Sequence, residues 1–112
     1  MKKLADSTCV ACSKSAKTLS SDEISVLMLE INGWALISDS GIQKLKRVFK
    51  VKNYIEAVAL THKIADLAET ADHHPKIILE YGAVTIIWWS HNIQGLHKND
   101  FIMADKTSQL SV

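Results

Sequence analysis

The sequence predicts an α+β fold, in which a four-stranded antiparallel sheet has helices packed on one face. The spacing of apolar residues gives the element order α-β-β-α-β-β-α. The strands come in adjacent pairs joined by short turns, and such an order with few parallel crossovers is typical of antiparallel sheets. The chain has 112 residues, which is enough for one domain. We expect residues 19–112 to form this domain and residues 1–18, which show no periodicity, to form a mobile N-terminal tail.

The first helix and the first pair of strands carry clear end signals. Ser20 and Glu23 have the spacing of a capping box, and Asn32-Gly33 can end the helix because Gly adopts the left-handed conformation. Residues 34–37 then predict a short strand. A turn over 38–41 leads to residues 43–51, whose alternating side chains predict a half-buried strand.

The second helix shows the strongest periodicity. Asn53 and Glu56 mark its start, and it should end near Ala71, because Pro75 disfavours helical geometry at the residue before it. One apolar stripe at helical spacing is expected to be buried. It consists of Tyr54, Ala57, Val58, Thr61, Ile64, Ala65 and Ala68.

The last part of the chain predicts a hairpin and a short helix. Two strands are expected over residues 76–81 and 84–90. Only Gly82 and Ala83 separate them, and Gly at the first of two turn positions favours a type II′ turn. The final helix is expected after Gly95.

The composition and charge are those of a globular protein. Apolar residues make up 47% of the chain, and 13 basic against 12 acidic residues leave a formal net charge of +1. This balance gives no reason to expect direct binding of nucleic acid or of an anionic membrane. The longest apolar stretch, over residues 83–89, falls short of the roughly 20 residues that cross a bilayer. The N-terminus lacks the apolar region of a signal peptide, so we expect a cytoplasmic protein.

The two cysteines form a single Cys-x-x-Cys motif at Cys9 and Cys12. One such pair, without a second pair or a suitably spaced pair of histidines, is a weak signal for metal binding. We expect reduced thiols in the tail, and the alternative is an accessory metal or redox role.

Three of the five histidines are expected to meet at one end of the sheet. With residues 82 and 83 as the turn, paired positions of the hairpin add up to 165, which sets His74 opposite His91. Directly opposed residues have Cβ atoms about 4.5–5.5 Å apart, and His73 would lie immediately beyond. Glu69, one helical turn before His73, can reach the same place.

This group of histidines supports three interpretations. Imidazole can both give and take a proton near neutral pH, which predicts an acid–base site. The adjacent histidines can instead be a polar start to a strand with a chance neighbour across the hairpin. Three imidazoles can also bind zinc, as in a zinc-dependent hydrolase. However, neighbouring strand residues point to opposite faces, which makes it harder for His73 and His74 to bind one ion together.

The spacing of these residues resembles the pterin-4a-carbinolamine dehydratase (4a-hydroxytetrahydrobiopterin dehydratase) family. The family pattern starts with an acidic or similar residue and continues with His-His-Pro, an aromatic residue, a His and an Asp. The gaps between these successive positions are three, five, nine and eight residues. This sequence satisfies it with Glu69, His73-His74-Pro75, Tyr81, His91 and Asp100. The resemblance covers residues 19–106, including Gly33-Trp34, the junction from Phe49 to Tyr54, and Gly95-Leu96.

The sequence departs from the family pattern at two positions. Ser90 stands where Thr is usual, but it keeps the hydroxyl group. His97 stands where Ser or Thr often caps the last helix, so a weaker cap is expected there.

The resemblance implies an activity and a set of site residues. The activity is the dehydration of 4a-hydroxytetrahydropterin to quinonoid dihydropterin and water, which recycles the pterin used by an aromatic amino acid hydroxylase. The pterin is the substrate, so the resemblance implies no cofactor, and it implies no metal. His73 and His91 are implied as general acid and base, and His74 as the catalytic residue that orients the pterin. The residues implied to contact the substrate are Trp34, Glu69, His73, His74, Pro75, Ser90, His91, Asn92 and Asp100.

Several of these assignments have structural alternatives. Trp34 can be a core residue at a strand start, Glu69 a solvated residue of the last helical turn, and Asp100 a partner of the helix dipole. The resemblance also implies a homodimer or homotetramer. The alternative function is a non-catalytic dimerisation or partner-binding module of the same fold, since some family members bind transcription factors.

Overall fold

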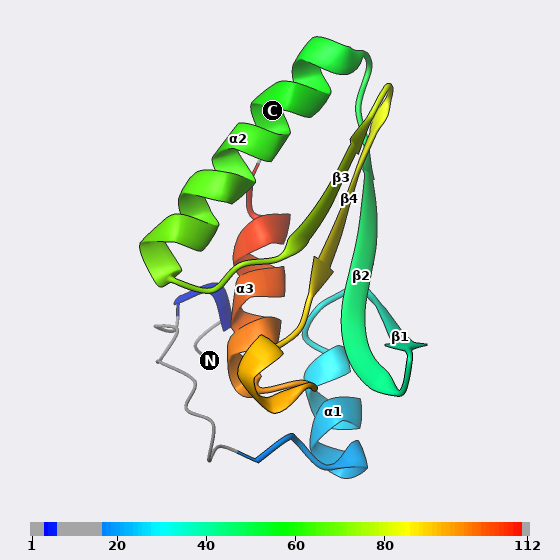
Figure 1. Ribbon diagram of the computed structural model, residues 1–112, viewed down its shortest axis with the longest axis vertical. Coiled ribbons are helices and arrows are strands. Elements are labelled where there is room, and N and C mark those ends of the chain that lie inside the picture. Colours follow the sequence, from blue (N-terminus) through cyan, green and yellow to red (C-terminus); the bar gives the residue numbers. More distant parts are fainter. Residues whose placement is uncertain (1–3, 7–16, 111–112) are drawn as a thin grey trace.

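The computed structural model describes residues 4–6 and 17–110, and its helices and strands have the predicted order (Figure 1). The elements are η1 Leu4–Asp6, α1 Ser21–Met28, β1 Ala35–Asp39, β2 Ile42–Lys50, α2 Tyr54–Ala71, β3 Lys76–Glu80, β4 Ala83–Trp88, η2 His91–Ile93 and α3 Lys98–Ser108, where η marks a short 3-10 helix. The four strands form one antiparallel sheet in the order β1-β2-β4-β3. Helices α2 and α3 lie on the same side of this sheet (Figure 1), and the predicted fold class is confirmed. Within the described ranges, no helix is both long and apolar enough to span a membrane.

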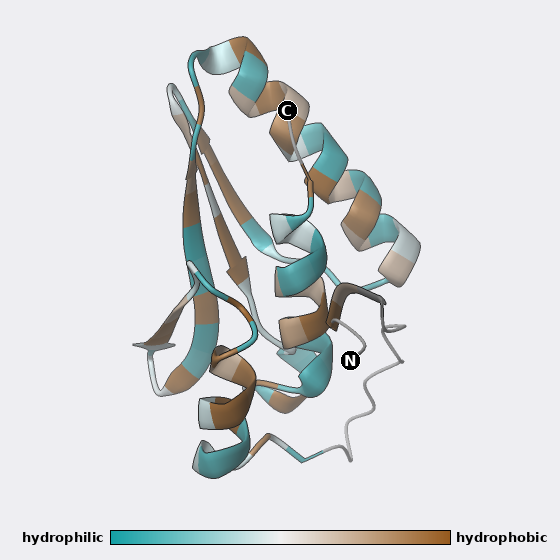
Figure 2. Cartoon of the chain, turned by 180° about the vertical axis from the view of Figure 1, so that it is seen from behind, coloured by the Kyte–Doolittle hydropathy of each residue, from teal (hydrophilic) through white to brown (hydrophobic). Residues whose placement is uncertain are grey.

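The core lies between the sheet and the two long helices. Every residue of β4, a central strand of the sheet, is buried. The neighbouring strand β2 is only partly buried, and its ribbon has both teal and brown segments in Figure 2 because it carries polar and apolar residues. The helix α3 contributes Phe101, Met103 and Ala104, which are fully buried. This packing fixes the start of α3 against the end of β4, where the candidate site lies.

The predicted buried stripe of α2 is partly wrong. Ala57, Ile64 and Ala68 are buried as predicted, and Leu60 joins them. Tyr54 and Val58, however, are 50% and 45% exposed. The face of α2 that meets the sheet is therefore rotated toward Leu60, and an apolar part of its first two turns stays at the surface.

The β1–β2 turn is tighter than predicted. Residues 38 and 39, expected in the turn, belong to β1. The turn consists of Ser40 and Gly41, with φ values of 54° and 81°. Two successive positive φ values define a type I′ turn, whose twist matches that of the flanking strands.

The predicted register of the β3–β4 hairpin is wrong. Glu80 pairs with Ala83, so the turn residues are Tyr81 and Gly82, and Gly82 takes its positive φ of 78° at the second position. This geometry is not a type II′ turn, which needs a positive φ at the first position. Contacts with the end of β2 and the residue after it explain the shift: Ala83 pairs with Lys50, and Val51 N donates to Gly82 O over 3.0 Å. Paired positions therefore add up to 163, and His74 does not lie opposite His91.

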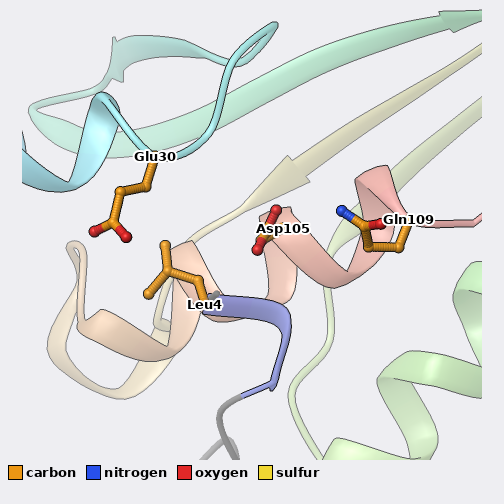
Figure 3. Close-up of a pocket in the computed structure, with 4 residues that line it drawn as sticks. All are labelled: Leu4, Glu30, Asp105 and Gln109. Carbon is orange, nitrogen blue, oxygen red and sulfur yellow. The ribbon is translucent and has the colours of Figure 1, made fainter. Parts of the chain in front are cut away.

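The short helix η1 lies against α3. Ala5 N donates to Asp105 Oδ2 over 2.7 Å, and Leu4 is buried. Leu4, Glu30, Asp105 and Gln109 line a cavity of about 300 Å³ (Figure 3). Cys9 and Cys12 lie outside the described residues, so their predicted state and the mobility of the tail stay predictions.

Candidate functional site

The end of α2 turns the chain so that His73 enters the core. Asp72 adopts the left-handed conformation, with a φ of 51°. His73 N then donates to Ala68 O over 3.1 Å, which is the long hydrogen bond of a Schellman motif. Pro75 follows immediately before β3, where a missing N–H is tolerated. This reversal buries His73 on the helix side of the sheet, at the end of β4, and leaves His74 at the surface.

His73 and Asp100 form a buried pair. His73 Nε2 lies 2.7 Å from Asp100 Oδ1, and their side chains are 10% and 0% exposed. The second carboxylate oxygen, Oδ2, accepts hydrogen bonds from Ser90 Oγ at 2.7 Å and from His97 N at 2.9 Å. Three donors therefore converge on the Asp100 carboxylate, as a buried charge requires.

The start of α3 is capped by the side chain of His97. His97 Nδ1 accepts a hydrogen bond from Asn99 N over 3.1 Å, while the Asp100 side chain accepts from His97 N. Together these contacts make a capping box with an imidazole nitrogen in place of a hydroxyl. Nδ1 therefore provides an acceptor at the helix start, and the expectation that His97 caps more weakly than Ser or Thr stays a prediction.

The other two histidines lie at the surface next to this pair. His74 Nε2 is hydrogen-bonded to Glu69 Oε2 in the last turn of α2. His91 Nε2 lies 3.2 Å from the carbonyl oxygen of His74. The loop that carries His91 is closed by a bridge in which Ser90 N donates to Gly95 O over 2.8 Å. His74 and His91 are therefore neighbours, but through this loop and not through strand pairing.

The hydrogen bonds assign the same tautomer to all three imidazoles. The partner of each Nε2 is a carboxylate or a carbonyl oxygen, at Asp100, Glu69 and the His74 main chain. Ionised carboxylates and carbonyls only accept hydrogen bonds, so each Nε2 carries a proton and donates it. Nδ1 is then the nitrogen whose protonation can change in a reaction.

The sequence analysis missed two residues that pack against the histidines, and a third that packs against one of these two. Trp88 is stacked on His73, with ring centroids 5.6 Å apart and an angle of 3° between the planes. Trp89 contacts His91 with a centroid distance of 4.3 Å. Lys44 Nζ lies 3.9 Å from the centroid of Trp89. The sequence signal that could have found them is the Trp88-Trp89 pair at a strand end. Successive residues there point to opposite faces, so one tryptophan is expected on each face of the sheet.

Lys44 is held in place by Asp39 at the end of β1. Its Nζ donates to Asp39 Oδ2 over 3.0 Å. This hydrogen bond and the charge of Lys44 hold the pKa of the Asp39 carboxyl below its ordinary value. Asp39 is therefore ionised at neutral pH and remains a partner for the Lys44 ammonium.

The structure gathers most of the predicted site residues, but not all of them. Glu69, His73, His74, Pro75, Ser90, His91 and Asp100 lie together at the open end of the β3–β4 hairpin. Asn92 follows His91 in η2 and is exposed.

Two further residues lie away from this group. Trp34 donates from Nε1 to Ser108 Oγ over 2.8 Å, and Ser108 is about 12 Å along α3 from Asp100 at 1.5 Å per residue. The structure therefore does not bring Trp34 to the histidines. Tyr81, the aromatic residue of the family pattern, lies in the turn at the other end of the hairpin.

The site has no arrangement of ligands for a metal. In the part of the chain that the structure describes, no group of three or more His, Cys, Asp or Glu side chains could hold a metal ion. Each of the three imidazoles instead uses Nε2 for a hydrogen bond. Independently of this, imidazole is a side chain that can give and take protons near neutral pH.

Comparisons with known proteins identify the family. Residues 17–110 match the family described as pterin 4 alpha carbinolamine dehydratase, and the chain belongs to this family. A protein of Nitrosococcus oceani is 50% identical over 110 residues, and one of Saccharophagus degradans is 47% identical over 110 residues. Each alignment covers 98% of this chain and 97% of the relative. Both relatives carry the provisional name pterin-4-alpha-carbinolamine dehydratase.

A solved structure shows the same fold. The transcriptional coactivator/pterin dehydratase from Brucella melitensis superimposes with a TM-score of 0.74 at 27% identity, covering 82% of this chain and 96% of that chain. Family membership confirms the resemblance found in the sequence, and it confirms the predicted enzyme class, a hydro-lyase.

Proposed function

We propose that this protein dehydrates 4a-hydroxytetrahydropterin to quinonoid dihydropterin and water by histidine acid–base catalysis. One observation carries the proposal within this family: two imidazole–carboxylate pairs and a third imidazole lie together at one sheet end. The reaction needs groups that give and take protons at neutral pH, and imidazole is the side chain best suited to this task.

The reaction needs one proton donor and one proton acceptor. The C4a–O bond breaks, and the hydroxyl group takes a proton and leaves as water. The N5–H bond loses its proton, and its electron pair forms the C4a=N5 double bond. We assign these two proton transfers to His73 and His91, each acting through Nδ1. A positioned proton transfer of this kind contributes typically about 10²- to 10⁴-fold to the rate.

We assign the orientation of the pterin to His74 and its neighbours. Glu69 holds the imidazole of His74, and the His74 carbonyl holds His91, so one residue links both surface groups. Ser90 supports the site from below through its bond to Asp100. Pro75 and Asn92 flank the histidines in the chain, where substrate contacts are expected.

The test is the rate of quinonoid dihydropterin formation from freshly generated 4a-hydroxytetrahydropterin, measured against the uncatalysed background. The wild type should exceed the background clearly, and His73→Ala and His91→Ala should each lose at least about 10²-fold in kcat. His62→Ala is the matched control, because His62 is an exposed histidine of α2 that pairs only weakly with Asp66 at 3.4 Å. Full activity in a folded His73→Ala, His91→Ala double variant would refute the mechanism.

We also propose that the chain self-associates through the start of α2. Tyr54, Ile55 and Val58 are 50%, 81% and 45% exposed there, and clustered exposed apolar side chains favour an interface. Light scattering on the wild type and on Ile55→Glu tests this proposal: a dimer or tetramer that becomes a monomer supports it. A monomeric wild type contradicts it.

The same surface suits a second candidate function, a non-catalytic dimerisation or partner-binding module. The Brucella melitensis protein carries the name of a transcriptional coactivator as well as that of a dehydratase. A folded wild type that forms no product above background, but self-associates through Ile55, would favour an assembly module over an enzyme.

A further inference from the structure

The two consecutive tryptophans at the end of β4 each pack against one histidine of the site. Trp88 points to the helix side of the sheet, where its Nε1 donates to Thr107 Oγ1 of α3 over 3.1 Å and its ring stacks on His73. Trp89, the residue after β4, continues the alternation of the strand to the opposite face, where its ring lies against Lys44 of β2. On that face its ring contacts the ring of His91.

Lys44 holds Trp89 from the neighbouring strand. Leu45 pairs with Trp88 in the β2–β4 register, so one further step sets Lys44 beside Trp89. The Lys44 side chain is only 11% exposed, which is unusual for a lysine. Its charge is compensated by Asp39 at 3.0 Å and by the indole ring at 3.9 Å. A cation over the face of an indole ring is attracted to it, so Lys44 restrains the position of Trp89.

His91 needs such a support more than His73 does. His73 is enclosed in the core and bonded to a buried carboxylate. His91 is exposed, and its Nε2 has a main-chain carbonyl at 3.2 Å as its acceptor. An exposed side chain loses rotamer freedom, at a cost in free energy, when substrate binding orders it. A flat neighbour that already restricts the imidazole in the free protein reduces this loss on binding.

We propose that Trp89, held by Lys44, is a positioning residue that fixes the ring of His91. The indole restricts the imidazole so that Nε2 stays on the His74 carbonyl and Nδ1 keeps one orientation. The effect on turnover rests on the proposed dehydratase function, whereas the effect on the ring of His91 does not.

The orientation of His91 is measured directly by NMR. The ring current of Trp89 shifts the Cε1–H and Cδ2–H resonances of His91, which are assigned by their loss in His91→Gln. Trp89→Leu should remove this shift, and Trp89→Phe should retain most of it. Lys44→Met should change the same resonances, and Lys44→Arg should restore them. Lys46→Met is the matched control, because Lys46 lies on the same strand and the same face, where it pairs with Ile87.

The kinetics test the consequence for the reaction. Trp89→Leu and Lys44→Met should lower kcat about tenfold with KM changed less than about twofold, since loss of orientation affects the transition state more than binding. Trp89→Phe and Lys44→Arg should recover most of the loss.

The two sets of measurements separate the two proposals. Unchanged His91 resonances in folded Trp89→Leu and in Lys44→Met overturn the positioning role, whatever the activity. A wild type without dehydration overturns the proposed function but leaves the resonance shifts to decide the role of Trp89. If Trp89→Leu does not fold, Lys44→Met decides alone, because it keeps the tryptophan.

Discussion

His73 and Asp100 are 27 residues apart in the chain, yet His73 Nε2 and Asp100 Oδ1 lie 2.7 Å apart in the core. The pair joins the end of α2 to the first turn of α3 across the end of β4. Trp88, the last residue of β4, stacks on the imidazole and closes this contact. The same interactions that dock α3 on the sheet therefore also build the chemical site.

The first prediction concerns the carboxylate of this pair. In Asp100→Asn, the single amide oxygen can keep the bonds from Ser90 Oγ and His97 N, and then the amide NH₂ faces His73 Nε2. Two donors cannot bond to each other, so His73 must move its proton to Nδ1. We expect kcat to fall by at least about 10²-fold with a small change in KM, because a general acid or base in the wrong tautomer cannot act.

Asp105→Asn is the control for this substitution. Asp105 lies on the same helix but accepts its hydrogen bond from Ala5 N, away from the histidines. It should keep the wild-type kcat. An Asp100→Asn variant with near wild-type kcat would show that the tautomer of His73 does not matter to the reaction.

The second prediction concerns the turn that delivers His73. Asp72 holds a φ of 51°, and the left-handed conformation costs a residue with a β-carbon roughly 1–2 kcal/mol. Asp tolerates it better than most residues, and a β-branched side chain tolerates it poorly. Asp72→Val should therefore lower the free energy of unfolding in urea by about 1–2 kcal/mol, while Asp72→Gly stays within about 0.5 kcal/mol of wild type.

Thr70→Val is the control for the turn. Thr70 is exposed in the last turn of α2 and has ordinary helical φ, so Val should cost clearly less there. Equal losses at positions 70 and 72 would mean that the positive φ of Asp72 carries no strain.

Most of the fold could be predicted because its signals are local. The Ser20–Glu23 capping box, the Asn53 cap and the Ser40-Gly41 turn region each depend on a few neighbouring residues. The β3–β4 register was wrong because Tyr81-Gly82 and Gly82-Ala83 satisfy local turn chemistry almost equally well. The choice is made by Val51 and Lys50 of another strand, which the hairpin sequence does not contain.

The same distinction applies to the site. The predicted hairpin register set His74 beside His91, and the two are neighbours in the structure, although the contact comes from the Ser90–Gly95 loop and not from strand pairing. The contact of Lys44 with Trp89 could not be predicted from spacing, because β2 and β4 are neighbours in the sheet but not in the sequence. For Trp34 the family resemblance implied a contact with the substrate. The structure instead places its indole against Ser108, away from the histidines.

The third prediction is a pH dependence at the Asp39–Lys44 pair. The hydrogen bond from Lys44 lowers the pKa of Asp39 below its ordinary 3.8. A carboxyl whose pKa is lowered by folding stabilises the fold above its unfolded pKa, and this contribution is lost as the pH falls through the folded value. The pair should therefore stay intact down to about pH 4 and break only below it.

A titration of the Asp39 carboxyl carbon by NMR tests this expectation. Lys44→Met should return the pKa of Asp39 most of the way to its ordinary value. Lys76→Met should move it less, because Lys76 acts on Asp39 only through its charge and more weakly. A larger effect from Lys76 than from Lys44 would mean that the hydrogen bond at 3.0 Å does not control this carboxylate.

The last prediction concerns the imidazole that caps α3. His97 Nδ1 accepts from Asn99 N, and this bond satisfies one of the N–H groups that every helix start leaves without a partner in the helix. His97→Ala removes the acceptor and should lower the free energy of unfolding by about 1 kcal/mol. His97→Ser supplies a hydroxyl at the same position, so it should match the histidine or exceed it. Urea unfolding gives the free energy of unfolding of the wild type and of both variants. If His97→Ala is as stable as the wild type, the imidazole contributes nothing as a cap.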